Sequence, residues 1–215
     1  MKAVIRPYGD ADRDAVRQIA FDTALMGQSA SSFFDGEEFL KDALTLYFTD
    51  YEPDALWVAE QDGEIVGYIM GAKDESVLHA VHVSKIFPHL LIELLRSGIL
   101  FSKKNLKLLA GLFQGLIRGE FRIPESVQGY PAVLHINLKD SVRGLGVGSA
   151  LMSELLNSFS EKGIKGVRLG TMSQQAADFF IKNGFELLHQ GQRSYLKDAL
   201  GKNIPLFVLG RRLIL

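Results

Sequence analysis

Hydrophobic residues in the C-terminal half of the chain alternate between short continuous runs and longer stretches with helical spacing. Residues 132–138 are typical of a buried strand, and residues 149–162 of an amphipathic helix. A second apolar run, 166–171, precedes a helix that Ser173 is expected to cap and that Gly184 is expected to end in a left-handed conformation. The pattern therefore predicts strand, turn, helix, strand and helix in that order.

The N-terminal third predicts a strand, two helices and a hairpin. Asp10 is the expected N-cap of the first helix, and the dipeptide Asp62-Gly63 is a strong signal for a tight hairpin turn. The expected elements are a strand at 3–6, a helix from Asp10 to the Leu25 region, a second helix over 39–48, and strands at 56–60 and 65–70.

Residues 71–129 separate these two regions and predict a helical insertion, about 75–130. Residues 90–100 and 106–117 both have wide apolar surfaces at helical spacing. The second helix is locally basic, through Lys103, Lys104, Lys107, Arg118 and Arg122. A membrane-surface helix is one interpretation of such a pattern. A lid on the same domain, or the interface of a homodimer, is the more common one and is preferred here. No apolar run reaches the roughly 18 residues of a membrane span, so no span is expected.

Composition narrows the class of protein. The 215 residues suit one domain, 1–215, and nearly half are apolar, enough for a sizeable core. The formal net charge of −1 gives no global attraction for nucleic acid. The chain has no cysteine, and no metal site is expected. The N-terminus shows no signal-peptide pattern, so we expect a cytoplasmic protein.

The most informative motif is the glycine-rich turn between the strand at 132–138 and the following helix, Arg143-Gly144-Leu145-Gly146-Val147-Gly148. Backbone N–H groups at a helix N-terminus bind phosphate, and glycines let the backbone approach it closely. The turn lacks the Gly-Lys-Ser/Thr ending of a mononucleotide P-loop. Ser149 stands where the dinucleotide fingerprint has its third glycine. The plain alternative is a strand-to-helix turn with incidental glycines.

The remaining pattern, Arg-x-x-Gly-x-Gly, resembles the acyl-CoA pyrophosphate loop of the GNAT (general control N-acetyltransferase) superfamily. The run from Ala176 through Phe179 and Phe180 to Gly184-Phe185 is similar to the fourth helix of that superfamily. The resemblance implies an α/β (α+β) fold whose mixed, mostly antiparallel sheet is flanked by helices, with the helical insert between the third and fourth strands.

The resemblance extends to a bacterial subgroup. Tyr51-Glu52-Pro53, residues 57–68 and residues 130–138 are similar to the acetyltransferase-like domain attached to some O-GlcNAc hydrolases. The chain has no room for a hydrolase domain.

The resemblance implies direct transfer of acetyl from acetyl-CoA to a primary amine of a small molecule, an amino sugar or a peptide. In the family the pantetheine arm pairs like an extra strand with the strand before the loop. This carries over to the backbone of Ile136 and Leu138, where the Leu138 N–H is expected to polarise the thioester carbonyl. The implied cofactor-binding residues are Ile136, Leu138, Arg143, Gly144, Leu145, Gly146, Val147, Gly148, Ser149, Ser173, Ala176 and Phe180.

The catalytic groups are less well determined. His135 suits proton removal by its ordinary pKa of about 6.5, although it also suits a histidine hydrogen-bonded in the core. Phe180 stands where the family commonly has a tyrosine acid, so Tyr195 or water is expected to protonate the thiolate. Asp35, Tyr51 and Glu52 are expected on the acceptor side. The alternative function is a non-catalytic acyl-CoA-binding or regulatory module, suggested by Phe180.

Overall fold

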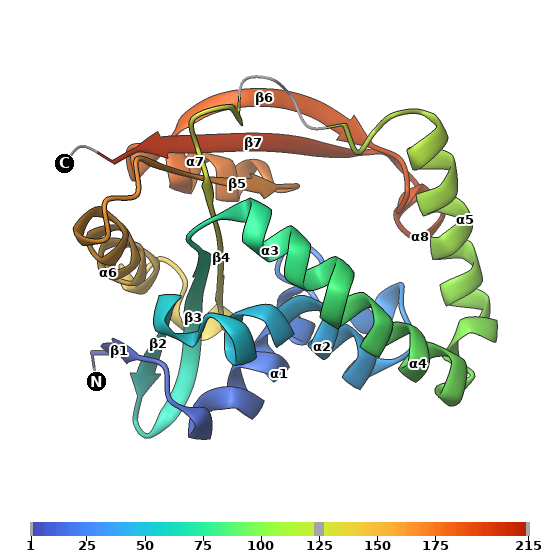
Figure 1. Ribbon diagram of the computed structural model, residues 1–215, viewed down its shortest axis with the longest axis horizontal. Helices are drawn as coiled ribbons and strands as arrows, with labels where there is room; N and C mark the ends of the chain where they lie inside the picture. The colour runs from blue at the N-terminus through green and yellow to red at the C-terminus, as the bar shows by residue number, and fades with distance from the viewer. Residues whose placement is uncertain (1, 123–126, 214–215) are drawn as a thin grey trace.

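Seven strands form one sheet in the computed structural model, which describes residues 2–122 and 127–213 (Figure 1). The spatial order is β1-β2-β3-β4-β5-β7-β6. Every neighbouring pair is antiparallel except β4 and β5, which are parallel. The predicted mixed, mostly antiparallel sheet is therefore confirmed. The strands are β1 Val4–Pro7, β2 Leu56–Gln61, β3 Glu64–Ala72, β4 Ala132–Leu138, β5 Gly166–Thr171, β6 Glu186–Arg193 and β7 Ile204–Arg212.

Helices cover both faces of the sheet. The α-helices of the described residues are α1 Arg13–Thr23, α2 Glu37–Leu46, α3 Glu75–Val81, α4 Phe87–Ser97, α5 Lys103–Ile117, α6 Val147–Glu161, α7 Gln174–Lys182 and α8 Lys197–Leu200. Helices α6 and α7 pack on one face, and α1, α2 and α4 pack on the other. The helices α3, α4 and α5 lie between β3 and β4 in the chain, as predicted for the insertion.

The core under α6 is close-packed. Leu151, Leu155 and Phe159 project from α6 and are completely buried, together with Leu134 of β4. Gly71 of β3 allows this approach, because a Cβ at that position would lie 2.6 Å from the Phe159 ring. Truncating a buried phenylalanine of this kind to alanine typically costs about 3–5 kcal/mol.

Several predicted end signals are confirmed. Ser173 caps α7, its Oγ accepting the Ala176 N–H at 3.3 Å. Gly184 has a φ of +81°, the left-handed conformation expected after that helix. Asp62 and Gly63 both have positive φ in the β2–β3 turn, as a two-residue hairpin requires.

The start of the first helix differs from the expectation. Residues Asp10–Asp12 form a single 3-10 turn, and α1 begins at Arg13. Asp12 is the N-cap residue of α1, and its carboxylate reaches back across the 3-10 turn to accept the Gly9 N–H at 2.9 Å. Arg6 binds the same carboxylate and fixes it in place. The helix also ends at Thr23, before Leu25.

The insertion differs more. One helical stretch runs from Glu75 to Ser97, with a wide turn at His82–Ile86, where the sequence predicted a helix only from residue 90. By length and composition alone it qualifies as a membrane span among the described residues, and most of it is exposed. The prediction for 106–117 is confirmed by α5, which begins slightly earlier, at Lys103. Residues 123–126 of the expected insertion lie outside the described residues.

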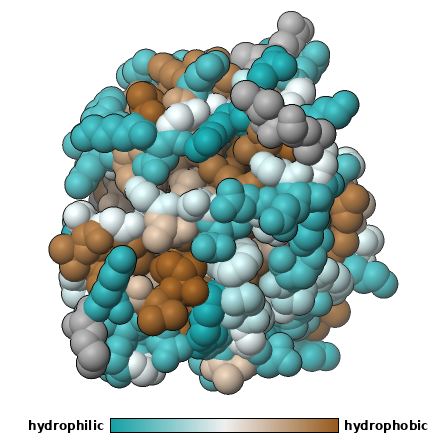
Figure 2. Space-filling view, turned by 90° about the vertical axis from the view of Figure 1, so that its left-hand side faces the viewer, coloured by the Kyte–Doolittle hydropathy of each residue, from teal (hydrophilic) through white to brown (hydrophobic). Residues whose placement is uncertain are grey.

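The insertion extends away from the sheet at one end of the molecule. In Figure 1, α4 continues past α2, and α5 turns up beside α8 and the ends of β6 and β7. Figure 2 views the opposite end, where hydrophilic side chains cover much of the surface and hydrophobic ones form islands between them.

Candidate functional site

The glycine-rich turn joins the end of β4 to α6 and leaves several backbone groups unpaired. Val142, buried in the core, anchors the turn, and Gly144 and Gly146 adopt φ values of +78° and +82°. Ala150 is the first residue of α6 whose N–H bonds back to the turn, to the Gly146 carbonyl. Among the described residues no backbone acceptor faces five N–H groups, those of Gly144, Gly146, Val147, Gly148 and Ser149.

These amides lie at the positive end of the α6 dipole. Such a set binds an anion such as a phosphate. The turn also approaches its neighbours closely, because a Cβ at Gly148 would lie 3.1 Å from the Phe179 ring and 3.3 Å from the Leu138 side chain. The amides, α7 and the end of β4 therefore meet at one place.

Arg143 brings a positive charge to the mouth of the turn. Its guanidinium donates to the Leu138 carbonyl at 3.1 Å and pairs with the Asp140 carboxylate at 2.5 Å. A Cβ at Gly27 would lie 2.8 Å from the same guanidinium, so the loop after α1 passes directly beside it. Arg143 is thus held beside the unpaired amides from three directions.

The edge of β4 next to β5 is open along most of its length. The two strands pair only at Ala132 with Val167 and at Val133 with Arg168. Beyond these pairs β5 continues alongside β7, and β4 diverges from it (Figure 1). The C-terminal part of β4 therefore has a sheet neighbour on one side only.

The register shows which residues face this gap. Lys139 N–H donates to the Val66 carbonyl of β3 at 2.8 Å, so the odd-numbered residues of β4 turn their backbone groups toward β3. The even-numbered residues, including Ile136 and Leu138, turn theirs toward the gap. The open edge thus offers the backbone groups that the resemblance assigns to the pantetheine arm.

His135 projects from β4 on the face that carries α1 and α2. Its ring meets Phe48 edge-on, with centroids 5.7 Å apart. The His135 residue is exposed to solvent, and neighbouring side chains such as Phe48 remove part of the water from around its ring. Burial lowers the pKa of His135, so its imidazole is neutral at pH 7. No described residue hydrogen-bonds either ring nitrogen, which disfavours the reading of His135 as a hydrogen-bonded core histidine.

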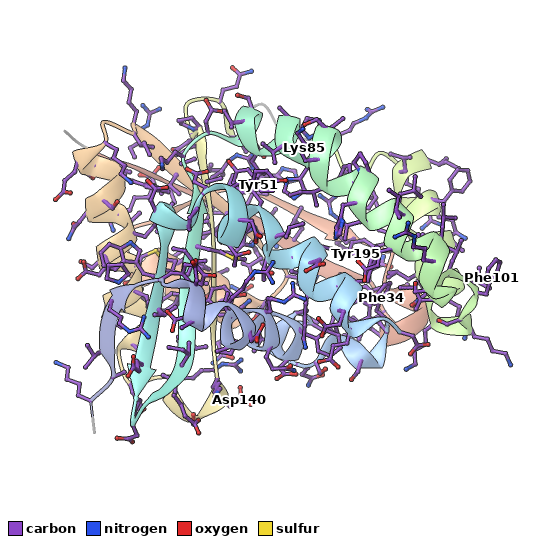
Figure 3. All side chains as sticks on the ribbon, turned by 60° about the horizontal axis from the view of Figure 1, so that its bottom comes forward. Phe34, Tyr51, Lys85, Phe101, Asp140 and Tyr195 are labelled. Carbon is purple, nitrogen blue, oxygen red and sulfur yellow. The ribbon has the colours of Figure 1, made fainter. Side chains whose placement is uncertain are left out.

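Tyr195 follows β6 and reaches the C-terminal end of β5. Its hydroxyl donates to the Met172 sulfur at 3.4 Å, directly after β5 ends at Thr171. Burial raises the pKa of Tyr195, so the phenol keeps its proton at neutral pH. Its backbone lies against Gly111 of α5, where a Cβ would come within 2.3 Å of the Tyr195 carbonyl oxygen. Tyr195 is half-buried, and Figure 3 shows Asp140, which marks the glycine-rich turn, at the lower edge of the view.

The two aromatic residues of α7 have different surroundings. Phe180 is 4% exposed and packs edge-on against Phe179 and Phe185 in the core below α6. Phe179 is only partly buried and is the residue that touches the turn at Gly148. The cofactor contact assigned to Phe180 stays a prediction of the sequence, and the structure adds Phe179 as the ring beside the turn. The helical spacing of an aromatic pair does not say which member faces a neighbouring turn.

The three residues expected on the acceptor side have structural partners or lie at the surface. Both Glu52 oxygens are occupied, one by the Tyr47 hydroxyl at 2.7 Å and the other by the Lys73 N–H at 3.0 Å. Asp35 pairs with Lys104 of α5 at 3.0 Å. Tyr51 stacks on Tyr47 and is about half exposed. Phe48 lies between Tyr47 and His135, so Glu52 and His135 are two rings apart.

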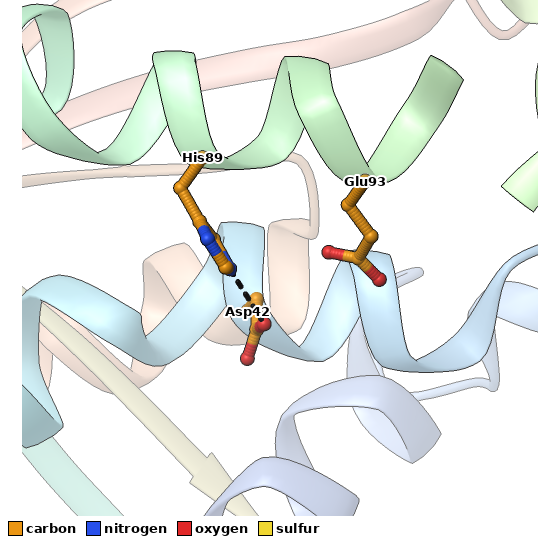
Figure 4. A group of neighbouring side chains, drawn as sticks. All are labelled: Asp42, His89 and Glu93. Atoms are coloured by element: carbon orange, nitrogen blue, oxygen red, sulfur yellow. Dashed lines mark ion pairs between the residues drawn. The ribbon is translucent and has the colours of Figure 1, made fainter. Parts of the chain in front are cut away.

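A separate polar group joins α4 to α2. Asp42, His89 and Glu93 place one potential ligand atom each within 4.8 Å of one another (Figure 4). Arg17 of α1 pairs with Asp42, and His89 Nε2 lies 3.6 Å from the other Asp42 oxygen. One oxygen of Glu93 is buried without a partner among the described residues. Because Arg17 already neutralises Asp42, we interpret the group as the polar contact that holds the insertion on α2.

Comparisons with known proteins agree with this geometry. No family model and no curated protein sequence matches the chain. Among solved structures, SsHAT is similar over 100% of both chains, with 26% identity and a TM-score of 0.76. The yncA protein of Salmonella typhimurium, determined with its cofactor acetyl-CoA, covers 100% of this chain and 95% of its own, with 16% identity and a TM-score of 0.60.

A phosphinothricin acetyltransferase of the GNAT superfamily from Sinorhizobium meliloti, in complex with acetyl-CoA, covers 99% of this chain and 89% of its own. It has 17% identity and a TM-score of 0.59. The likeness is one of overall fold, and within that fold this chain has a glycine-rich turn with unpaired amides next to an open edge of β4. The chain therefore has the fold of the GNAT acetyltransferases.

Proposed function

We propose that the protein transfers an acetyl group from acetyl-CoA to a primary amine of a small molecule, an amino sugar or a peptide. The observation that carries the proposal is the set of unpaired amides at the start of α6, directly beside the open edge of β4. Two similar proteins, from Salmonella typhimurium and Sinorhizobium meliloti, are described with acetyl-CoA. Acetyl-CoA supplies the acetyl group as a thioester and carries the diphosphate that such a turn suits.

The chain's own groups suggest how the co-substrate is held. The amides of Gly146, Val147 and Gly148 and the guanidinium of Arg143 would bind the diphosphate. The backbone of Ile136 and Leu138 would align the pantetheine arm, since both residues face the gap between β4 and β5. Phe179, Leu145, Ser149, Ser173 and Ala176 border the same turn or the start of α7 and would contact the cofactor.

The Leu138 N–H is the group proposed to polarise the thioester carbonyl. A preorganised donor of this kind is worth about 3 kcal/mol of barrier. Arg143 supports it by binding the Leu138 carbonyl, which fixes the peptide unit that follows Leu138. The strand edge would thus both orient the substrate and stabilise negative charge on the carbonyl oxygen.

His135 is proposed as the general base. Its side chain lies on the face of β4 that carries α1 and α2, from which an amine would approach the gap. Because burial keeps the imidazole neutral, it can accept a proton from an ammonium group directly or through water. Tyr195, with its raised pKa, is proposed to return a proton to the departing thiolate.

Acceptor recognition is proposed for the surface between His135, the α1–α2 connection and Tyr51. Asp35, paired with Lys104 of α5, and Glu52, bonded to Lys73 just after β3, would favour a cationic amine by their charge. Residence in the cytoplasm and membership of the O-GlcNAc-hydrolase-like subgroup stay predictions of the sequence. No observation in the structure favours the alternative of a non-catalytic binding module.

The test is release of free thiol from acetyl-CoA in the presence of an amine panel that includes polyamines, amino sugars and peptides with free N-termini. We expect thiol release with at least one class of amine, together with coenzyme A binding measured by calorimetry. Coenzyme A binding without transfer to any class of amine would support the binding module. Absence of binding would overturn the assignment of the glycine-rich turn.

A further inference from the structure

Helices α4 and α5 present hydrophobic side chains to solvent on an unusual scale. The exposed residues follow one stripe along each helix, at spacings of three and four. They are Phe87, Leu91, Ile92 and Leu95 of α4 and Leu106, Leu109, Phe113, Leu116 and Ile117 of α5. Phe101, in the turn between the two helices, is 78% exposed and projects from the end of the molecule (Figure 3). We call these ten residues the insertion surface.

The stripes are not the core-facing sides of these helices. Ile86, just before α4, and Leu90 of α4 are buried against the α1–α2 layer, and α5 packs on Tyr195 of the C-terminal segment at Gly111. Both helices are therefore already docked by their other sides. Soluble monomers rarely expose a contiguous apolar patch of this kind unless a partner or a membrane covers it.

Charge in this part of the chain is strongly segregated. Residues 76–118 contain six lysines and arginines but one acidic residue, Glu93, whereas the rest of the chain has 18 basic and 24 acidic residues. Glu93 is turned inward against Asp42, and Lys104 pairs with Asp35. Five cations remain without an ion pair among the described residues: Lys85, Arg96, Lys103, Lys107 and Arg118, of which Arg118 donates to the Ser194 hydroxyl.

We propose that the insertion surface docks the protein on an anionic lipid membrane, with α4 and α5 lying in the plane of the interface. An apolar stripe flanked by lysine and arginine is the pattern of a helix that lies in a membrane surface. The Glu75–Ser97 helix does not cross the membrane in this arrangement, because its inner side stays packed on α2.

Charge favours lipid over a second copy of the chain as the occupant. A symmetric pair through this surface would bring the unpaired cations of two insertions together. A pair between the insertion and the acidic remainder would meet mostly polar surface, as the opposite end of the molecule shows (Figure 2). An anionic membrane offers both the apolar layer and the negative charge.

The arrangement leaves the proposed cofactor site accessible. In Figure 3, Asp140 beside the glycine-rich turn and Phe101 of the insertion surface lie at different edges of the molecule. Membrane docking and acetyl transfer are therefore separable, and the docking proposal does not depend on the proposed activity.

Cosedimentation with vesicles tests the proposal. The full chain should bind vesicles of phosphatidylcholine mixed with phosphatidylserine, bind vesicles of phosphatidylcholine alone far more weakly, and lose binding as salt is raised. Changing Lys103→Gln together with Lys107→Gln should lower the partition coefficient by about five-fold per lysine. The matched control changes two exposed lysines of the remainder, Lys182→Gln and Lys202→Gln, and should leave binding unaltered.

A second pair of variants tests the apolar contribution. Phe101→Asp should reduce vesicle binding at least tenfold, whereas Ile181→Asp, at an exposed apolar position on α7, should not. Sedimentation velocity on the same samples identifies a second copy as the occupant. Equal binding to both kinds of vesicle would overturn the proposal. It would also be overturned if the protein bound neither kind of vesicle and formed a dimer that Phe101→Asp dissociates.

Discussion

Helices α6 and α5 have the same length and both carry an apolar stripe, yet the structure uses the two stripes in opposite ways. Leu151, Leu155 and Phe159 of α6 are completely buried, and the first turn of α6 leaves backbone N–H groups without a partner among the described residues. On α5 the stripe ending at Ile117 stays in solvent. The helix is held by Gly111, which packs on Tyr195, and by Asn105, which bonds to the backbone of Asp35. The start of α6 is thus suited to hold a ligand through its backbone, whereas α5 presents apolar side chains to a partner surface.

The largest effect on activity is expected at His135, which belongs to the proposed acetyl-transfer site. His135→Gln should lower kcat about 10²-fold or more, because it removes the proposed base. Burial lowers the pKa of His135 below its usual range, so wild-type activity should hold through pH 6.5 and fall only at more acidic pH, as the imidazole gains a proton. Thiol release measured across pH should show that this acidic limb is absent from the variant.

The control for that experiment is His189→Gln, at an exposed position on β6. It should leave both kcat and the acidic limb unchanged. An acidic limb that persists at the same pH in His135→Gln would assign the proton transfer to another group.

The next effect contrasts two arginines, one in each region. Arg143→Glu should weaken coenzyme A binding about 100-fold, because it removes a charge-assisted bond and adds an anion beside the unpaired amides. Arg96→Glu makes the same charge change at an exposed position of α4 that has no ion-pair partner among the described residues. It should leave coenzyme A binding unchanged and weaken binding to anionic vesicles.

Calorimetry and cosedimentation on both variants give a two-way comparison. If the two regions act separately, Arg143→Glu should weaken only coenzyme A binding in calorimetry, and Arg96→Glu should weaken only vesicle binding in cosedimentation. If Arg96→Glu also lowered the affinity for coenzyme A, the insertion and the glycine-rich turn would have to be coupled, and the comparison would be wrong.

A smaller effect is expected from Tyr195→Phe. Because water can replace a lost acid in a site open to solvent, we expect kcat to fall only about tenfold, with the KM for acetyl-CoA unchanged. The bond to the Met172 sulfur is weak, so the melting temperature should hardly change. A parallel loss of kcat and of thermal stability would instead indicate that Tyr195 serves to pack α5 and α8 against β7.

The contrast between the two regions also marks what sequence could predict. The strand–glycine–helix turn and the Ser173 cap depend on residues close together in the chain, and both were predicted at the right positions. The partners of Asp35 and Glu52 could not be predicted, because Lys104 and Lys73 are brought to them by the fold. Position in the sequence suggests that Asp35 and Glu52 lie on the acceptor side, but it does not show that their carboxylate oxygens already bond to other residues.

The start of the insertion was missed for a local reason. The sequence interpretation began this helix at residue 90, whereas α4 begins at Phe87 and holds Pro88 in its first turn, where a missing N–H costs little. The wide turn at His82–Ile86 then joins α3 to α4 without a loop. Periodicity predicted that α4 and α5 exist, but it could not say that their apolar stripes face solvent, because that depends on which of two apolar sides the sheet covers.

The smallest effect concerns the polar contact that joins the two regions. Glu93 has an oxygen buried without a partner among the described residues, and burial together with the Asp42 charge raises its pKa. A carboxyl whose pKa is higher in the folded state binds its proton more tightly there. Stability is therefore greatest below the unfolded pKa of about 4.5 and declines as pH rises through the folded value. At pH 7 the ionised carboxylate opposes docking of α4 on α2.

Glu93→Gln should accordingly raise the free energy of unfolding by about 1 kcal/mol at pH 7 and change it little at pH 4. Urea unfolding at the two pH values measures the difference, with Glu154→Gln on α6, whose carboxylate has no partner among the described residues, as the control. A loss of stability at pH 7 would mean that the carboxylate is needed ionised, as a ligand of a cation shared with Asp42 and His89. Asp42, His89 and Glu93 would then form a cation-binding site. In that case α4 would contribute to ligand binding as well as to the insertion surface.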